Sequence, residues 1–397
     1  MGPGGALLGF SATCYFSAKS ILLGRPASER TVPLGLIAAP WGGTTIKAHA
    51  PPHVNETCAP LFPGGTFGCG MDHAPCNASE IYNAMLRPIS GPSGPAMPLA
   101  ALIWVRASQG RGVSAPRLAP EPPPNTTHPR AHPTPAPHPQ FQGENDAAEA
   151  EAPAGAALAP ASALPWYTCM LQGLAAALRA DHASPNAHWT TIQLAPYTGG
   201  AALAPFRAMQ CSATAAIPNA HCAVLLDDGD VLSPIGTVHS RNKQLVGARV
   251  AAGVLEALYG VPHPTHARGP VFASHALATQ ANGSLSALVS FAPEGLGAGG
   301  ALVYVPPHAT PYSNSTRCPS ELGIIKPSDC AWPSIVGSDG RAYSGSAQAA
   351  GGGRQLLITA QAPPGVSAVG SALGWGPWPV VNFYNQYGIP VEAWYEM

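Results

Sequence analysis

His239 has surroundings that suit proton transfer, because it lies on a short polar stretch directly before a segment with helical periodicity. A neutral imidazole in that position can accept the proton of a hydroxyl nucleophile and act as a general base. Such a histidine works best with an acid that orients its ring. Three aspartates at the end of the preceding apolar run are candidates for that acid: Asp227, Asp228 and Asp230. The alternatives are a solvated loop histidine and aspartates that cap a turn.

Two adjacent glycines, Gly42 and Gly43, follow another apolar run of the sequence. Because glycine has no Cβ atom, such a pair lets a backbone N–H group come close to a bound anion, as an oxyanion donor must. An ordinary tight turn would use the same residues. The glycines are therefore either part of a binding site or a simple turn.

Four short apolar runs predict buried parallel strands that would position these residues at their ends: 32–40, 98–104, 189–196 and 222–228. Apolar residues on one face predict helices over 166–182 and 243–260, and Gly260 fits the end of the second. Strands that alternate with helices form βαβ units, whose ligand sites lie at the carboxyl ends of the strands. We therefore expect an α/β fold with a parallel sheet.

The character of the sequence changes after about residue 262, where helical periodicity ends and short apolar runs alternate with Gly, Pro and Ser. We expect one domain over 1–262 and a second, mostly β domain over 263–397. Residues 105–140 interrupt the first domain with a stretch rich in Pro and His. Its few large apolar side chains cannot offset the entropy of ordering, so we predict a disordered insert, consistent with a translated intron.

The sequence segments on either side of this insert together form a family motif. If the insert were absent, Trp104 would be followed by residues 141–146, Phe-Gln-Gly-Glu-Asn-Asp. This resembles the Trp-Tyr-Gln-Gly-Glu-Ser-Asn motif of sialate O-acetylesterases, which are members of the SGNH-hydrolase superfamily. Other stretches resemble blocks of that family in the same order: PLGLIAAPWGGTTIKAH, IYNAMLRPI, SPIGTVHSRNKQLVGARV and WGPWPVVNFYNQYGIPVEAW.

The resemblance implies a fold and an activity. The fold would be a three-layer, flavodoxin-like parallel sheet of the SGNH-hydrolase type, followed by a mostly β C-terminal domain. The activity would be removal of O-acetyl groups from sialic acid or related sugars by serine-hydrolase chemistry, with no cofactor and no metal. The partner would be an O-acetylated carbohydrate.

The resemblance also implies roles for individual residues. His239 would be the general base, and Asp227 fits the position of the acid best, with Asp230 next. Many SGNH enzymes carry the acid three residues before the histidine, but Gly236 stands there, so the acid lies elsewhere or the pair works as a dyad. The glycines of the second block would border the oxyanion hole. The other side of the pocket would consist of Gln142, Gly143, Glu144, Asn145 and Asp146.

The nucleophile is where this sequence departs most from the family. The serine lies there in a Gly-Gln-Ser-Asn-Met motif, which does not occur here. Ser11 and Ser17 lie in a helix-like stretch and are expected to be structural. We therefore expect the chain to begin after the nucleophile segment and to be inactive as written. The alternative is a non-catalytic protein that binds glycans. Two smaller departures are Ser240 in place of proline and Lys47 in place of glutamate.

Composition and sequons bound the partners and the compartment. Only 10% of the residues are charged and the formal net charge is −1, so nucleic acid is an unfavourable partner. No apolar run reaches the roughly 18 residues of a membrane helix. Five N-x-S/T sequons indicate a secreted or lysosome-like glycoprotein, although no signal peptide is visible. The five are Asn55, Asn77, Asn125, Asn282 and Asn314.

The nine cysteines fit the same compartment. Two close groups suggest local disulfides: Cys58, Cys69 and Cys76 in one, and Cys318 with Cys330 in the other.

Overall fold

The structure is a computed structural model that describes residues 10–62, 77–90, 97–104, 146–147, 165–200, 202–234, 236–261, 268–297, 299–307 and 316–397. The predicted insert 105–140 lies outside these residues. The same holds for Gln142, Gly143, Glu144 and Asn145 of the predicted pocket loop.

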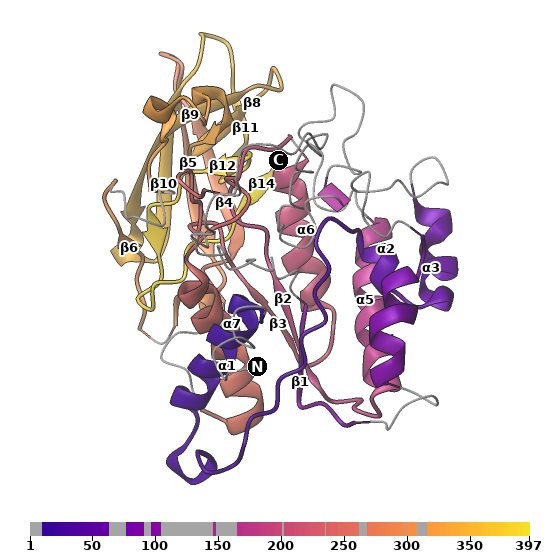
Figure 1. The fold of residues 1–397 in the computed structure, drawn as a ribbon. Helices are drawn as coiled ribbons and strands as arrows, with labels where there is room; N and C mark the ends of the chain where they lie inside the picture. Colours follow the sequence, from indigo (N-terminus) through magenta and orange to yellow (C-terminus); the bar gives the residue numbers. More distant parts are fainter. Residues whose placement is uncertain are drawn as a thin grey trace, which may run out of the picture.

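The N-terminal part is built on a parallel sheet of three strands in the order β1-β2-β3. The strands are β1 (Ala101–Trp104), β2 (His188–Ile192) and β3 (Ala220–Ala223). Helices α1 (Ala12–Gly24) and α7 (Lys243–Tyr259) cover one face, and α5 (Pro165–Asp181) and α6 (Leu203–Ala215) cover the other (Figure 1). Shorter helices α2 (Ile46–His49) and α3 (Pro52–Cys58) pack near α5, and a π-helix spans Tyr82–Leu86. This confirms the predicted α/β class.

Each face of the sheet has its own apolar core. On one face, Ile192 and Ala223 of the strands pack with Val246, Val250 and Val254 of α7. On the other face, aromatic and aliphatic side chains of α5 and α6 pack against the tryptophans of β1 and β2; the cluster includes Trp104, Trp189, Met170, Leu174 and Phe206. The helix predicted over 243–260 is confirmed, and Gly260 ends it in the left-handed conformation that glycine favours.

The predicted strand over 32–40 is wrong. These residues lie outside the sheet, and Val32, Leu36 and Ile37 are exposed. An apolar run becomes a strand only where a neighbouring strand pairs with its backbone, and local sequence does not show whether that neighbour is present. Helix α6 was not among the predicted elements.

The C-terminal part is an antiparallel sheet of seven strands in the order β14-β11-β8-β9-β10-β5-β4. Their bounds are β4 Phe272–Thr279, β5 Ser284–Phe291, β8 Ser334–Gly337, β9 Ala342–Ala350, β10 Gln355–Gln361, β11 Ala368–Leu373 and β14 Trp394–Glu396. Side chains join β4 to β11 and nearly close a barrel: His275 Nδ1 lies 2.8 Å from Ser371 Oγ, and Thr279 Oγ1 accepts from the Ala368 N–H at 2.8 Å. The predicted β-rich C-terminal part is confirmed.

Short elements complete the C-terminal part, and an apolar cluster joins that part to the parallel-sheet part. Two strand pairs are β6 (Val303–Tyr304) with β13 (Phe383–Tyr384) and β7 (Cys330–Ala331) with β12 (Trp378–Pro379). A short helix, α8, spans Pro293–Leu296. A shared apolar cluster joins Cys222, Val224 and Leu226 at the end of β3 to Val381 and Tyr384.

Three disulfides occur among the described residues. Cys318–Cys330 is the predicted local pair, and Cys211–Cys222 joins α6 to β3. Cys58 pairs with Cys169, which joins α3 to α5 and differs from the local pairing suggested by the sequence. Cys69 and Cys76 lie outside the described residues. Disulfides of this number are typical of an extracellular or secretory protein.

Candidate active site

The loop between β3 and α7 carries the candidate base. His239 lies three residues before the N-cap of α7, Asn242, whose side chain accepts from the Leu245 N–H. The imidazole is buried, and the backbone N–H of His239 donates to Gly236 O at 3.0 Å. Gly236 has φ +103°, a conformation that glycine adopts without strain. The loop histidine is therefore held inside the protein rather than solvated.

An ion pair closes this loop directly around the histidine. The fully buried carboxylate of Asp230 accepts from Arg241 Nε at 2.7 Å and from Arg241 Nη2 at 2.9 Å. It also accepts from the backbone N–H groups of Leu232 and Arg241. These contacts bring the two ends of the segment 230–241 together, with His239 between them. The structure thus places Asp230 as a loop-closing residue.

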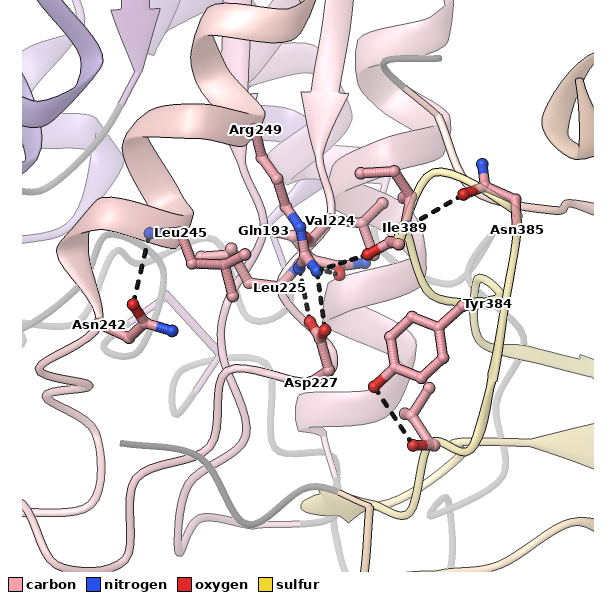
Figure 2. Close-up of polar contacts among 12 residues, drawn as sticks. Gln193, Val224, Leu225, Asp227, Asn242, Leu245, Arg249, Tyr384, Asn385 and Ile389 are labelled. Atoms are coloured by element: carbon pink, nitrogen blue, oxygen red, sulfur yellow. Dashed lines mark hydrogen bonds and ion pairs between the residues drawn. The ribbon is translucent and has the colours of Figure 1, made fainter. Parts of the chain in front are cut away.

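A second ion pair closes the base of the same loop. Asp227 Oδ1 and Oδ2 accept from Arg249 Nη1 at 2.5 Å and Nη2 at 2.7 Å (Figure 2). Arg249 lies on α7 and also donates to Val224 O at 2.7 Å. Beside this carboxylate, the pKa of the Tyr384 hydroxyl is raised, first by burial and then by the charge of Asp227. Asp227 therefore joins the end of β3 to α7 and to the C-terminal part.

Asp228 differs from its two neighbours in its electrostatic setting. Its side chain is fully buried, and burial raises the pKa of the carboxyl to about 8. Lys243 and a hydrogen bond with Ser240 act in the opposite direction, and the charge of Asp227 adds to the rise. Ser240 is the residue directly after His239, so this acid faces the histidine segment. In the sequence analysis, Asp228 was a candidate for the acid but was ranked behind Asp227 and Asp230.

The two predicted sides of the pocket meet at helix α2. Gly42 and Gly43 form a turn, with Gly43 at φ +79°, and Thr44 Oγ1 donates to Trp41 O at 3.2 Å. Asp146 is fully buried and accepts from the Ile46 N–H at 3.0 and 3.2 Å. The acid of the predicted pocket loop thus caps the helix that follows the glycines, which brings these two segments into contact. This contact is a local structural role for Asp146.

Several contributing residues were missed by sequence reasoning. His49 is buried, lies 2.9 Å from Thr44 Oγ1 through Nε2 and contacts the Trp104 ring edge-on at 5.3 Å between centroids. Arg241 and Arg249 were missed as partners of the aspartates. A signal for Arg249 was present: it interrupts the apolar surface of a helix in a chain with few charges. Thr198, after β2, hydrogen bonds to Thr237 at 2.8 Å and steadies the loop.

Within the described parts of the chain, no group of three or more His, Cys, Asp or Glu side chains is arranged to hold a metal ion. In the same residues, no helix combines the length and apolar character needed to cross a bilayer.

The comparisons with known proteins place this fold. No protein-family model matches the chain, and no match is found among the curated proteins. Among solved structures, a carbohydrate acetylesterase from Xanthomonas citri, XAC1771, is similar, with a TM-score of 0.59 and 20% sequence identity. The match covers 97% of this chain and 65% of that one, so the chain spans about two thirds of that esterase. The chain therefore has an α/β fold with a parallel sheet flanked by helices, followed by a near-barrel β sheet, as in a carbohydrate acetylesterase.

Proposed function

We propose that this chain carries the base-bearing part of a carbohydrate O-acetylesterase site, with His239 as the general base. The observation that carries the proposal is the buried histidine on a loop closed by two ion pairs at the end of β3. Ligand sites of parallel α/β sheets lie at this edge. The fold similarity to a carbohydrate acetylesterase supports the same assignment.

The chemistry proposed for the site is acyl transfer in two steps. A serine hydroxyl attacks the acetyl carbonyl while His239 takes its proton, and the sugar oxygen leaves with that proton returned from the imidazolium. Water, deprotonated by the same imidazole, then attacks the acetyl-serine, and the serine oxygen leaves with that proton as acetate is released. Asp227 and Asp230 are proposed to act on the base indirectly, because their ion pairs with Arg249 and Arg241 fix the loop that carries His239.

The glycine turn and the loop that precedes Asp146 are proposed to border the oxyanion hole. The contact between Asp146 and the Ile46 N–H supports this placement only in that it keeps the two segments beside each other. Backbone N–H groups near Gly42 and Gly43 could then donate to the tetrahedral oxyanion. The substrate proposed is an O-acetylated sialic acid or a related sugar, met in the secretory pathway or outside the cell.

Neither serine at the N-terminal helix α1 is proposed as the attacking nucleophile. Ser11 caps α1, and Ser17 is fully buried on the same helix, so both are structural. We expect residues 1–397 by themselves to hydrolyse 4-nitrophenyl acetate no faster than their His239→Ala variant. A clear histidine-dependent rate would show that a nucleophile lies within these residues.

The decisive experiment concerns sequence encoded before Met1. If a transcript encodes a Gly-Gln-Ser-Asn segment in frame there, the longer chain should release acetate from O-acetylated sialosides. Its His239→Ala variant should then lose about 10⁴-fold or more of that rate. A longer chain with no histidine-dependent hydrolysis would contradict the esterase proposal.

The second candidate is a glycan-binding protein without catalysis. A verified start at Met1 would favour it, because the sequence as given has no family-type serine motif. Binding of O-acetylated sialosides by residues 1–397, measured by calorimetry beside the de-O-acetylated sugar as control, would support recognition of the acetyl group.

A further inference from the structure

Two buried arginines tie the parallel-sheet part of the chain to the C-terminal β part. They are Arg249 on α7 and Arg207 on α6. A buried guanidinium must have its hydrogen bonds satisfied by protein groups, so its partners show which segments it holds together. The two arginines have different partners, and this difference carries the inference.

Arg249 connects three segments at the base of the histidine loop. It donates to both Asp227 oxygens and to Val224 O, and its Nη2 donates to Gly388 O at 3.2 Å. Gly388 belongs to the C-terminal part, whereas Val224 and Asp227 follow β3. Figure 2 shows the guanidinium of Arg249 beside the carboxylate of Asp227, with the ring of Tyr384 from the C-terminal part also near that carboxylate.

The C-terminal partner of Arg249 is itself held in a fixed turn. Asn385 Oδ1 accepts from the N–H groups of Tyr387 and Ile389, each at 3.0 Å. Asn385 Nδ2 donates to Gly295 O at 3.0 Å, which anchors the turn in the β part. The Gly388 carbonyl is therefore held in a fixed position. Because Arg249 bonds to both Gly388 and Asp227, it fixes the base of the histidine loop against this turn.

A hydrophobic contact holds the same loop at a second point. Val231, directly after Asp230, is buried in a cluster with Trp378 and Val380. The disulfide-bonded Cys330 belongs to this cluster, and Cys318 packs against it. The loop that carries His239 is thus fastened to the C-terminal part both at its base and beside its inner ion pair.

We propose that the C-terminal β part positions His239, and that Arg249 and Val231 are the positioning residues through which it acts. The β part is then a component of the candidate site and not an independent appendage. The importance of this arrangement for catalysis rests on the proposed function. The positioning of His239 by these residues is independent of the proposed function and can be tested without it.

Arg207 provides a matched control. Its Nε and Nη2 donate to Leu194 O at 3.0 Å and Ala195 O at 3.1 Å, which follow β2. On the C-terminal side, Nη1 and Nη2 donate to the carbonyls of residues 376 and 377, each at 2.8 Å. Arg207 therefore joins the same two parts of the chain as Arg249 does, but its contacts on the sheet side end after β2 and not in the histidine loop.

The test is the rate at which diethyl pyrocarbonate modifies individual histidines of the full chain, read by peptide mass spectrometry. Exposed His53 is the internal standard for reagent, and buried His188 reports global opening. We expect Arg249→Lys to raise the rate at His239 by about tenfold or more relative to His188, because only the loop opens. Arg207→Lys should leave the ratio of His239 to His188 unchanged.

Two further variants secure the result. Asp227→Asn removes the charge that pairs with Arg249, and Val231→Ala reduces the apolar contact with Trp378 and Val380. Both should raise modification of His239 selectively, even if Arg249→Lys fails to fold. Equal gains at His239 and His188 in all three variants would overturn the proposal, because the residues would then act on global stability alone. A selective gain at His239 in Arg207→Lys would overturn it as well. No outcome depends on esterase activity, so failure of the proposed function would be seen separately.

Discussion

Asp230 shows how a residue with a catalytic-looking position can act by closing a loop. Its buried carboxylate accepts hydrogen bonds from the Leu232 backbone and from the backbone and guanidinium of Arg241. Hydrogen bonds to a charged group are stronger than neutral ones, and a buried charge that loses its partner is costly. Two residues earlier, the carboxyl of Asp228 is instead favoured in its uncharged form, because burial raises its pKa to about 8.

Replacing Asp230 by Asn is expected to lower the free energy of unfolding by about 1–3 kcal/mol, because Asn offers one neutral acceptor oxygen and turns its NH₂ donor toward groups that donate to the second carboxylate oxygen. Urea denaturation at pH 7 measures this loss. Asp339→Asn is the control, since its contacts with Arg341 at 3.8 Å and with the Tyr343 hydroxyl at 2.8 Å lie at the surface, where water can replace them, so its effect on stability should be much smaller. Equal effects of the two substitutions would contradict the loop-closing role.

Three of the five sequons lie within the described residues and differ in whether the folded protein leaves them accessible; Asn125 and Asn314 lie outside those residues. The Asn55 amide is buried, and its Nδ2 donates to Lys47 O, Ala50 O and Ser79 Oγ at 3.0–3.1 Å. Asn77 and Asn282 are exposed. A glycan on Asn55 would replace one of the two Nδ2 hydrogens and force the segment apart, because a sugar is bulky and requires solvent.

We therefore expect glycans at Asn77 and Asn282, and none at Asn55, in protein secreted from eukaryotic cells. Enzymatic deglycosylation in H₂¹⁸O followed by peptide mass spectrometry records the occupancy of each site. Folded, secreted protein that carries a glycan at Asn55 would contradict the hydrogen-bonded role of this residue.

At the scale of elements, the neighbouring strands β2 and β3 each contribute one histidine to a pair. His188 Nε2 and His221 Nδ1 are 2.9 Å apart, and Asn219 and Thr190 hydrogen bond to the pair. Helix α7 presses on His221 at Gly253, where an added Cβ would lie 2.1 Å from the ring, and Arg249 O contacts His221 Nε2 at 3.2 Å. Burial lowers the pKa of His221 to about 3 and also lowers the pKa of His188.

This pair predicts that stability falls as the solution is acidified. Above about pH 6.5 the site is neutral in both the folded and the unfolded states, so its full contribution is present. As the pH falls from about 6.5 toward 3, the unfolded chain binds protons that the folded chain excludes, which favours unfolding. Nearby Arg179 reinforces this exclusion at His188, whereas Glu256 on α7 opposes it.

We expect a loss of about 1–2 kcal/mol in the free energy of unfolding between pH 7 and pH 5 from this pair. The His221→Gln variant should show a flatter pH dependence over that interval, measured by urea denaturation at each pH. The exposed His53→Gln serves as control and should follow the parent chain. An unchanged slope in His221→Gln would show that the pair does not titrate on unfolding.

At the scale of the whole molecule, the disulfides restrain segments that are very different distances apart in sequence. Cys58 and Cys169 are separated by 111 residues, whereas Cys211 and Cys222 are separated by 11. In the chain-entropy description, removal of the long-range crosslink costs about 5 kcal/mol and removal of the short one about 3 kcal/mol. The double Cys→Ala variants, compared by thermal unfolding, should therefore rank in that order. The reverse order would indicate that strain or residual structure dominates.

The predicted insert sets a second test at this scale. Residues 105–140 follow β1 directly, and the next described residue, Asp146, caps α2. We expect deletion of 105–140 to raise soluble yield and leave the thermal midpoint unchanged, because the segment carries few groups that can join a core. Loss of folded protein after the deletion would contradict the interpretation of this segment as an intron-derived insert.

What the sequence alone determined about this protein is mostly local. The helix over 243–260 with its glycine end, the strands predicted over 98–104 and 189–196, the β-rich C-terminal part and the Cys318–Cys330 pair all follow from periodicity or from close spacing. In the structure the two strands span Ala101–Trp104 and His188–Ile192. These features depend on residues within a few turns or one loop of each other, so composition and spacing suffice to predict them.

The tertiary structure decided the rest. It placed residues 32–40 outside the sheet and paired Cys58 with Cys169. It formed the ion pairs of Asp227 with Arg249 and of Asp230 with Arg241. It also packed the C-terminal part against the histidine loop. Each of these outcomes depends on which distant groups come within hydrogen-bond or van der Waals distance once the chain is packed. Burial then makes such partners obligatory, because a charged or polar group removed from water must be satisfied by whatever the fold brings beside it.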